Sequence, residues 1–163
     1  MAKIIALCGK ICCGKTYYAH QIKDKEKAII LSCDELTNVI FDNNLGDKHD
    51  EITFRIYNYL KKKSVELVNI GCTVILDWGF WSSDNRSSLT EFYRSNNINC
   101  EWHYIDVDDQ TWHKNIEERN RRILNGECSS DYYLDEGLIR KLLSLWEKPS
   151  KDEIDVYYKL DRK

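Results

Sequence analysis

The residues best suited to chemistry stand near the start of the chain, in the stretch Gly9-Lys10-Ile11-Cys12-Cys13-Gly14-Lys15-Thr16. This stretch matches G-x-x-x-x-G-K-[ST] at every fixed position, and it lies between an apolar run and a helical pattern, the context expected of a phosphate-binding loop. The two glycines let the backbone curl so that its N–H groups converge on phosphate oxygens, and the helix N-terminus adds positive potential. Lys15 would reach the β- and γ-phosphates of a nucleotide, and the Thr16 hydroxyl would bind Mg²⁺. The residues predicted to bind ATP are Gly9, Ile11, Cys12, Cys13, Gly14, Lys15, Thr16 and Tyr17.

A phosphate-bound Mg²⁺ needs a second protein oxygen opposite this loop. Asp77 ends the apolar run Val74-Ile75-Leu76-Asp77, where a strand would deliver such a carboxylate. The alternative is an aspartate that only enters a turn with Gly79. The loop upstream favours a role for Asp77 on Mg²⁺ or its water shell.

Asp34 is the candidate general base. It comes directly after the apolar run Ala28-Ile29-Ile30-Leu31, and in parallel sheets ligands bind beyond the carboxyl ends of the strands. A carboxylate there would face the phosphate loop and take the proton of an acceptor hydroxyl. The alternative is an acidic residue favoured by the helix dipole in a first turn. Ser32 and Glu35 already form a capping box, so Asp34 is not needed to start the helix.

The segment after Asp77 supplies candidate substrate contacts. Asp84 is either such a contact or part of a helix start, as Ser82 and Ser83 beside it suggest. Arg86 opposes the dipole near that helix start, which favours contact with an anion or substrate. Trp78, with Phe80 and Trp81, either walls the acceptor pocket or packs in the core or a lid.

A cluster of arginines marks a candidate lid. Glu117-Glu118-Arg119-Asn120-Arg121-Arg122 precedes Asn125-Gly126, and arginines stabilise charge on a transferring phosphoryl group. The alternative is a solvated helix face with i,i+4 pairs between Glu117 and Arg121 and between Glu118 and Arg122. Arg119 has Asn115 rather than an acid four residues before it, so it is the best single candidate.

The elements that position these residues alternate along the chain, and repeated strand–helix alternation indicates parallel βαβ units in a three-layer α/β fold. Strands are predicted at 4–7, 28–31, 72–77, 102–107 and 154–158, and helices at 15–24, from 32–35 through Ile40, and at 50–69, 84–95, 109–124 and 135–146.

Length and composition fit one compact domain over residues 1–163, with 42% apolar and 31% charged residues. No apolar run approaches the length of a membrane helix, so no membrane partner is expected. The net charge of -3 makes nucleic acid an unexpected partner, although it does not exclude a local basic groove. Seven cysteines, two of them adjacent, suggest reduced thiols in a cytoplasmic protein rather than a disulfide framework.

These motifs resemble those of the small P-loop kinases of the zeta-toxin, chloramphenicol-phosphotransferase and polynucleotide-kinase group, which are often described as AAA-type ATP-binding proteins. The resemblance covers nearly the whole chain. It rests on the phosphate loop, Leu31-Ser32-Cys33-Asp34-Glu35, Val74-Ile75-Leu76-Asp77-Trp78-Gly79-Phe80-Trp81 with Arg86, Glu118-Arg119-Asn120, and Trp146-Glu147-Lys148-Pro149 with Glu153.

The resemblance implies a five-stranded parallel sheet in the order 2-3-1-4-5 with helices on both faces and a small lid near 119–131. It also implies that Asp34 is the general base and that Arg119 and Arg122 contact ATP phosphates. Polynucleotide kinases of the group carry an arginine three residues after the base, where this chain has Thr37. That departure argues against a nucleic-acid acceptor.

The sequence therefore predicts a kinase, monomeric or dimeric, that uses ATP and Mg²⁺ to phosphorylate a hydroxyl of a small molecule. The alternatives are a nucleoside, nucleotide or polynucleotide 5′-kinase, and an ATP-binding regulatory protein without transferase activity. The N-K-x-D guanine motif of GTPases and the L-S-G-G-Q signature of transporter ATPases do not occur.

Overall fold

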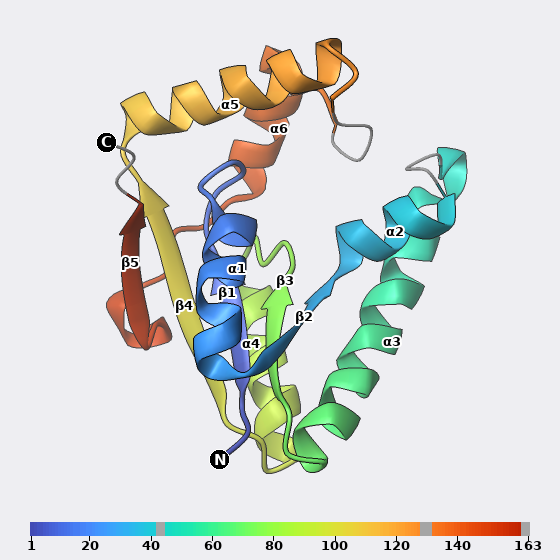
Figure 1. The fold of residues 1–163 in the computed structure, drawn as a ribbon, viewed down its shortest axis with the longest axis vertical. Helices are drawn as coiled ribbons and strands as arrows, with labels where there is room; N and C mark the ends of the chain where they lie inside the picture. Colours follow the sequence, from blue (N-terminus) through green and yellow to red (C-terminus); the bar gives the residue numbers. More distant parts are fainter. Residues whose placement is uncertain (42–44, 128–131, 161–163) are drawn as a thin grey trace.

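The computed structural model describes residues 1–41, 45–127 and 132–160 and is built on a five-stranded sheet (Figure 1). The strands are β1 (Ile4–Cys8), β2 (Ala28–Ser32), β3 (Thr73–Asp77), β4 (Cys100–Val107) and β5 (Val156–Leu160). Their order is β2-β3-β1-β4-β5, and every neighbouring pair is parallel, which confirms the predicted topology.

The helices connect these strands. They are α1 (Lys15–Glu26), α2 (Cys33–Phe41), α3 (His49–Asn69), α4 (Ser83–Ser95), α5 (Asp109–Leu124) and α6 (Glu136–Leu145), with 3₁₀ turns at Gly46–Lys48 and Lys151–Glu153. The predicted elements are all present, with ends that shift by a few residues. The predicted last strand moves furthest along the chain, from 154–158 to Val156–Leu160. The last four residues of the predicted lid, 128–131, lie outside the described residues.

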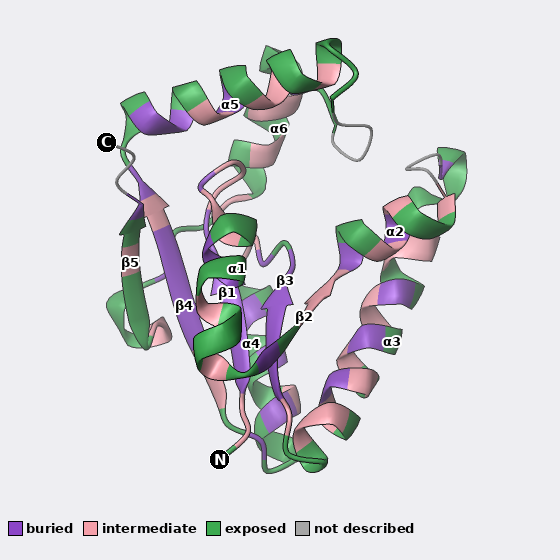
Figure 2. Ribbon diagram, viewed as in Figure 1, coloured by how far each residue is buried: buried purple, intermediate pink, exposed green. Residues whose placement is uncertain are grey.

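The core has two halves because successive side chains of a strand point to opposite faces of the sheet. Ile4 and Ala6 of β1 pack with α3 and α4, whereas Ile5 and Leu7 pack with α1 and α5. All five residues of β1 and of β3 are buried, as expected of central parallel strands covered on both sides (Figure 2). None of the described helices is long and apolar enough to cross a membrane.

The parallel strands bring their carboxyl ends to one edge of the sheet. Ser32, the last residue of β2, pairs with Asp77, the last residue of β3. Cys8 at the end of β1 leads directly into the phosphate loop. The groups predicted to do chemistry therefore emerge side by side, and α5 lies across the same end of the molecule (Figure 1).

Candidate active site

At two positions of the phosphate loop, Gly9 and Gly14, the structure leaves no room for a side chain. Gly14 has φ 96°, and a Cβ there would lie 2.8 Å from Cδ2 of Leu160. A Cβ on Gly9 would lie 2.4 Å from Sγ of Cys13 and 2.5 Å from the carbonyl oxygen of Ile105, both impossible contacts. The two motif glycines are thus required by the close approach of β4, β5 and the loop itself.

Two side chains of α5 hold the loop from outside. The indole N–H of Trp112 donates to the carbonyl of Ile11 over 2.7 Å, and the Asn115 amide donates to the carbonyl of Cys12 over 2.9 Å. These two carbonyls are thus engaged by α5, which leaves the N–H groups of the loop to bind an anion. Sequence reasoning missed both residues, since nothing in residues 109–124 signals which loop the helix will touch.

Lys15 curls back over its own loop. Its ammonium group donates to the carbonyls of Gly9 over 3.0 Å and Lys10 over 3.3 Å, and it lies 4.0 Å from Sγ of Cys13. Burial raises the pKa of the Cys13 thiol, which keeps that sulfur neutral beside the ammonium group. The Lys15 charge is therefore held by carbonyl dipoles that a phosphate could replace.

Thr16 and Asp77 form the second contact of the loop. The Thr16 hydroxyl donates to a carboxylate oxygen of Asp77 over 2.6 Å. Asp77 is buried, with 8% of its surface exposed, whereas Thr16 opens to solvent. The structure brings the two predicted metal ligands together.

Asp34 lies in the first turn of α2 and is exposed, at the end of the sheet that carries the loop. The pKa of the Cys33 thiol is raised to about 12. Burial is the main cause, and the negative charges of Asp34 and Asp77 add to it. Burial, and to a smaller extent the charge of Asp34, raise the pKa of Tyr132, so the segment after the candidate lid lies near Asp34. The backbone N–H of Glu35 donates to the Ser32 hydroxyl, which accounts for the helix start without Asp34.

The candidate lid arginines differ in their surroundings. Nε of Arg119 donates to the Tyr132 carbonyl over 3.3 Å, and Nη1 lies 3.8 Å from Sγ of Cys12 in the phosphate loop. Asn120 and Leu134 exchange two hydrogen bonds that tie the segment after the lid to α5. Arg122 is exposed, and Arg121 pairs with Glu127. Among the contacts within the described residues, Arg119 is the arginine of the three that reaches the phosphate loop.

Arg86 is buried, with 2% of its surface exposed. Its Nε donates to Glu153 over 2.7 Å and its Nη1 to the Glu147 carbonyl over 3.0 Å. The predicted anion or substrate contact is thus replaced, in this geometry, by an internal ion pair that joins two of the sequence motifs. Asp84 lies exposed in the first turn of α4, which Ser82 caps.

The three aromatic residues after Asp77 divide between the core and the surface beside Lys15. Trp78 and Phe80 are each 3% exposed and belong to the core, where Trp78 packs against Tyr57. Trp81 is partly exposed, and its ring centre lies 5.9 Å from Nζ of Lys15. The geometry favours core packing for Trp78 and a place beside the phosphate loop for Trp81.

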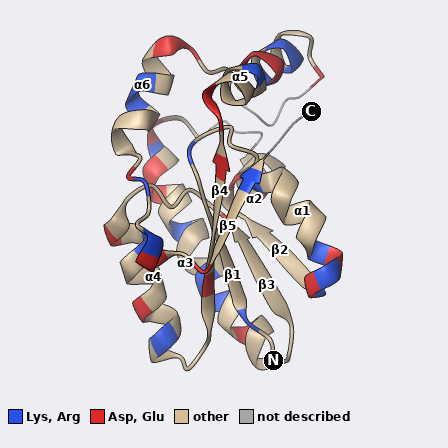
Figure 3. Cartoon of the chain, turned by 90° about the vertical axis from the view of Figure 1, so that its left-hand side faces the viewer, with Lys and Arg blue, Asp and Glu red and all other residues tan. Residues whose placement is uncertain are grey.

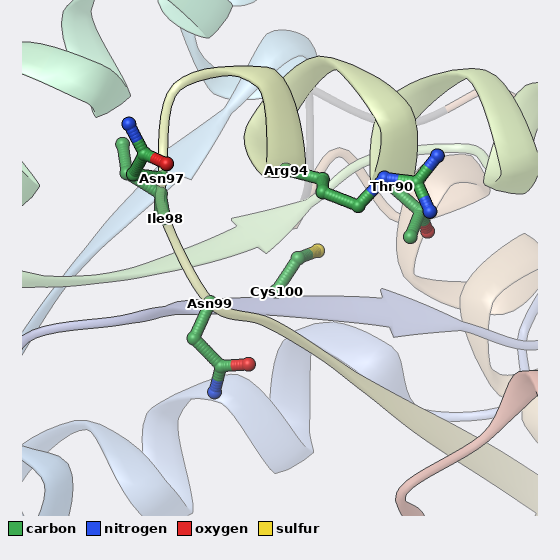
Figure 4. A pocket seen from close by; sticks show the side chains of 6 residues that line it. All are labelled: Thr90, Arg94, Asn97, Ile98, Asn99 and Cys100. Carbon is green, nitrogen blue, oxygen red and sulfur yellow. The ribbon is translucent and has the colours of Figure 1, made fainter.

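A surface hollow lies away from these groups. It has a volume of about 450 Å³ and is lined by Thr90, Arg94, Asn97, Ile98, Asn99 and Cys100, between the end of α4 and the start of β4 (Figure 4). This is the opposite edge of the sheet from Lys15. We therefore place the candidate active site by its chemical groups rather than by this hollow.

Comparisons with known proteins agree with the architecture. A sequence model of a family described as AAA domain matches residues 4–131. No curated protein sequence matches the chain significantly.

Solved structures resemble the whole chain. The APS kinase of Mycobacterium tuberculosis, in complex with AMPPNP and APS, has a TM-score of 0.67 at 17% identity, covering 99% of this chain and 90% of that one. A gluconokinase from Sinorhizobium meliloti has a TM-score of 0.65 at 10% identity, covering 99% and 84%. A sugar kinase from Janibacter sp. has a TM-score of 0.63 at 15% identity, covering 98% and 86%. At these identities the likeness establishes a shared fold.

Proposed function

This chain belongs to the AAA domain family, and within it we propose that the protein is a kinase that moves the γ-phosphoryl group of ATP to a hydroxyl of a small molecule. The observation that carries the proposal is the 2.6 Å contact between Thr16 and Asp77 beside Lys15. Kinases among the solved structures of the same fold support it.

The residues around Thr16 fit a magnesium ion. Mg²⁺ prefers oxygen ligands and is usually held by one or two protein groups together with substrate phosphates. Thr16 and Asp77 supply a hydroxyl and a carboxylate oxygen already within contact distance of each other. Bound there with ATP, the ion would neutralise charge on the phosphates.

The phosphate loop and lid would bind and orient ATP. Lys15 would give up its hydrogen bonds to the carbonyls of Gly9 and Lys10 and bind β- and γ-phosphate oxygens instead. These bonds would be stronger, because the phosphate oxygens are charged and the carbonyls are not. Arg119 reaches the loop at Cys12 and would add positive charge near the transferring group. Arg122 and Tyr17, both exposed, would complete the nucleotide contacts at the rim.

Asp34 would handle the proton. As the acceptor oxygen bonds to the γ-phosphorus, the bond from that phosphorus to the bridging oxygen of ADP breaks, and the hydroxyl proton passes to the Asp34 carboxylate and then to solvent. The exposure of Asp34 leaves room for an acceptor on its side of the crevice.

A screen of acceptors tests the proposal. Purified protein with Mg²⁺ and ATP is offered sugars, polyols, amino alcohols and nucleosides, and ADP formation is measured against Lys15→Ala as the inactive control. We expect acceptor-dependent ADP formation by the wild type, and none by the variant at unchanged circular dichroism. ATP binding with a slow hydrolysis that no acceptor accelerates would instead support an ATP-binding regulatory protein.

A polynucleotide acceptor has less support. Thr37, which stands where polynucleotide kinases of the resembling group have an arginine, is 6% exposed and donates its hydroxyl to the Cys33 carbonyl. Helices α1, α4 and α5 each carry both acidic and basic residues rather than a basic face (Figure 3). Tight, salt-sensitive binding of an oligonucleotide would reverse this preference.

A further inference from the structure

The segment after the candidate lid is tied to α5 at two points. Nε of Arg119 donates to the Tyr132 carbonyl over 3.3 Å. The Asn120 amide group exchanges two hydrogen bonds with the backbone of Leu134, at 2.9 and 2.8 Å. The backbone that carries the Tyr132 side chain is therefore held in place relative to α5.

Arg119 also joins this segment to the nucleotide end of the site. Its Nη1 lies 3.8 Å from Sγ of Cys12, a residue of the phosphate loop. One guanidinium group thus contacts both the phosphate loop and the Tyr132 carbonyl. Helix α5 ends above the carboxyl edge of the sheet, on the side of the molecule where α2 lies (Figure 1). The segment that follows it therefore starts between the two halves of the candidate active site.

The Tyr132 side chain lies near Asp34. It is not packed in the core, since 45% of its surface is exposed. Burial, and to a smaller extent the charge of Asp34, raise the pKa of Tyr132, and the charge effect requires the phenol and the carboxylate to be close to each other. The raised pKa keeps the phenol protonated, so its hydroxyl can donate a hydrogen bond. A hydrogen-bond donor therefore accompanies the candidate general base.

A donor beside a base suits the attack of a hydroxyl on phosphorus. The hydroxyl oxygen carries one proton and two lone pairs. When the proton points to Asp34 and one lone pair accepts a hydrogen bond from Tyr132, the other lone pair is left for the γ-phosphorus. Such orientation of the attacking group is a large part of what a kinase site supplies.

We propose that the Tyr132 hydroxyl contacts the phosphoryl acceptor and orients it, by donating a hydrogen bond to the oxygen that receives the phosphoryl group. The inference rests on the proposed kinase function and adds a residue to its acceptor side. As that oxygen bonds to the γ-phosphorus, the bond to the bridging oxygen of ADP breaks and the hydroxyl proton passes to Asp34. Tyr132 keeps its own proton throughout.

Removal of one oxygen tests the contact. Tyr132→Phe keeps the ring and the backbone carbonyl that Arg119 binds, so the dissociation constant for ATP should stay within about twofold of the wild type. The loss of a neutral hydrogen bond should lower kcat/KM for the acceptor by roughly 5- to 10-fold. The matched control is Tyr133→Phe, the same change at the neighbouring exposed tyrosine, which should leave both constants within about twofold.

The acceptor probes are glucose, glycerol, ethanolamine and uridine, and transfer is measured as ADP formation with Mg²⁺ and ATP. Circular dichroism of each variant excludes unfolding as the cause of a loss. Wild-type kcat/KM in Tyr132→Phe, or equal losses in Tyr132→Phe and Tyr133→Phe, overturns the contact and leaves the kinase function standing. If no probe accelerates ADP formation in a protein that binds Mg²⁺ and ATP, the proposed function and the inference fall together.

A variant of Asn120 tests whether the held backbone positions the phenol. Asn120→Ala removes both hydrogen bonds to Leu134 and changes neither Asp34 nor the phosphate loop. It should lower kcat/KM for the acceptor by about 2- to 5-fold, and the double variant with Tyr132→Phe should lose no more than Tyr132→Phe alone, because both changes remove the same contact. Fully additive losses would show that Asn120 does not act through Tyr132 and would overturn this positioning.

Discussion

The hydroxyl of Thr16 lies 2.6 Å from the carboxylate of Asp77, although 61 residues separate them in the chain. Thr16 is at the start of α1 and Asp77 at the end of β3, so the contact exists because β1 and β3 are neighbours in the sheet. It joins the two oxygens that would hold a phosphate-bound metal ion.

Replacement of Asp77 by Asn should therefore weaken the response to magnesium. Asparagine keeps the size and one oxygen but loses the charge, so the Mg²⁺ concentration that gives half-maximal turnover should rise by about 10- to 100-fold. The measurement is ADP formation over a magnesium titration at fixed ATP. Asp24→Asn, an exposed aspartate near the end of α1, is the control. An unchanged magnesium titration would exclude Asp77 from metal binding.

Asp34→Asn should lower phosphoryl transfer by roughly 100-fold, the usual scale for a positioned general base. Binding of ATP should be retained, because Asp34 lies on α2 and not on the phosphate loop. Product formation and nucleotide titration separate the two effects, with the exposed Asp47→Asn as the control. A kcat within about threefold of the wild type would reduce Asp34 to an acidic residue of a first helical turn.

Asn115→Ala should loosen the phosphate loop. The variant loses the hydrogen bond to the Cys12 carbonyl, a neutral interaction of about 1 kcal/mol, so the dissociation constant for ATP should rise by about 2- to 10-fold. Titration with a fluorescent ATP analogue measures it. Lys114→Ala, the exposed neighbour on α5, should bind like the wild type. Equal affinities of the two variants would show that the loop keeps its shape without α5.

Arg86→Met should destabilise the fold strongly. It removes the charged partner of Glu153 and one donor to the Glu147 carbonyl, and breaking a buried ion pair from one side costs about 3–5 kcal/mol. Because Glu153 is 26% exposed, the lower end is expected. Urea unfolding measures the loss, and the double variant with Glu153→Gln should recover part of it. Full stability of the single variant would mean that the ion pair is dispensable.

Protonation of His103 should make stability depend on pH. The ring is buried on β4, and its Nδ1 shares a 2.9 Å hydrogen bond with the Tyr18 hydroxyl of α1. Burial lowers the pKa of His103, against the opposing pull of the Glu101 carboxylate. The unfolded chain then binds more protons than the folded one, so stability falls as pH drops below about 6.5.

Urea midpoints at pH 5.5 and 7.5 measure this loss. In His103→Gln the difference between the two midpoints should shrink, whereas the exposed His113→Gln serves as the control. Should His103→Gln keep the full wild-type difference, another group would be responsible for the acid sensitivity.

The sequence alone determined the architecture and the nucleotide end of the site. The phosphate loop follows from local spacing, since two glycines, a lysine and a threonine within eight residues shape one continuous backbone segment. Strand–helix alternation identified the α/β class, and the family resemblance predicted the strand order that the structure confirms. Asp77 could be paired with Thr16 in advance because Asp77 ends one strand and Thr16 ends the loop that follows another, and the carboxyl ends of parallel strands meet at one edge of the sheet.

Only the tertiary structure decided which of the candidate side chains are buried in the core and which lie beside the phosphate loop. Arg86 looked like an anion contact from its position near a helix start, but the C-terminal segment folds back and supplies Glu153 and the Glu147 carbonyl. The sequence does not distinguish the aromatic residues Trp78, Phe80 and Trp81. In the structure the first two are buried in the core, and the third lies beside Lys15. The support of the phosphate loop by Trp112 and Asn115 depends on where α5 crosses the sheet. Each of these outcomes depends on packing between segments distant in the chain, which no local pattern encodes.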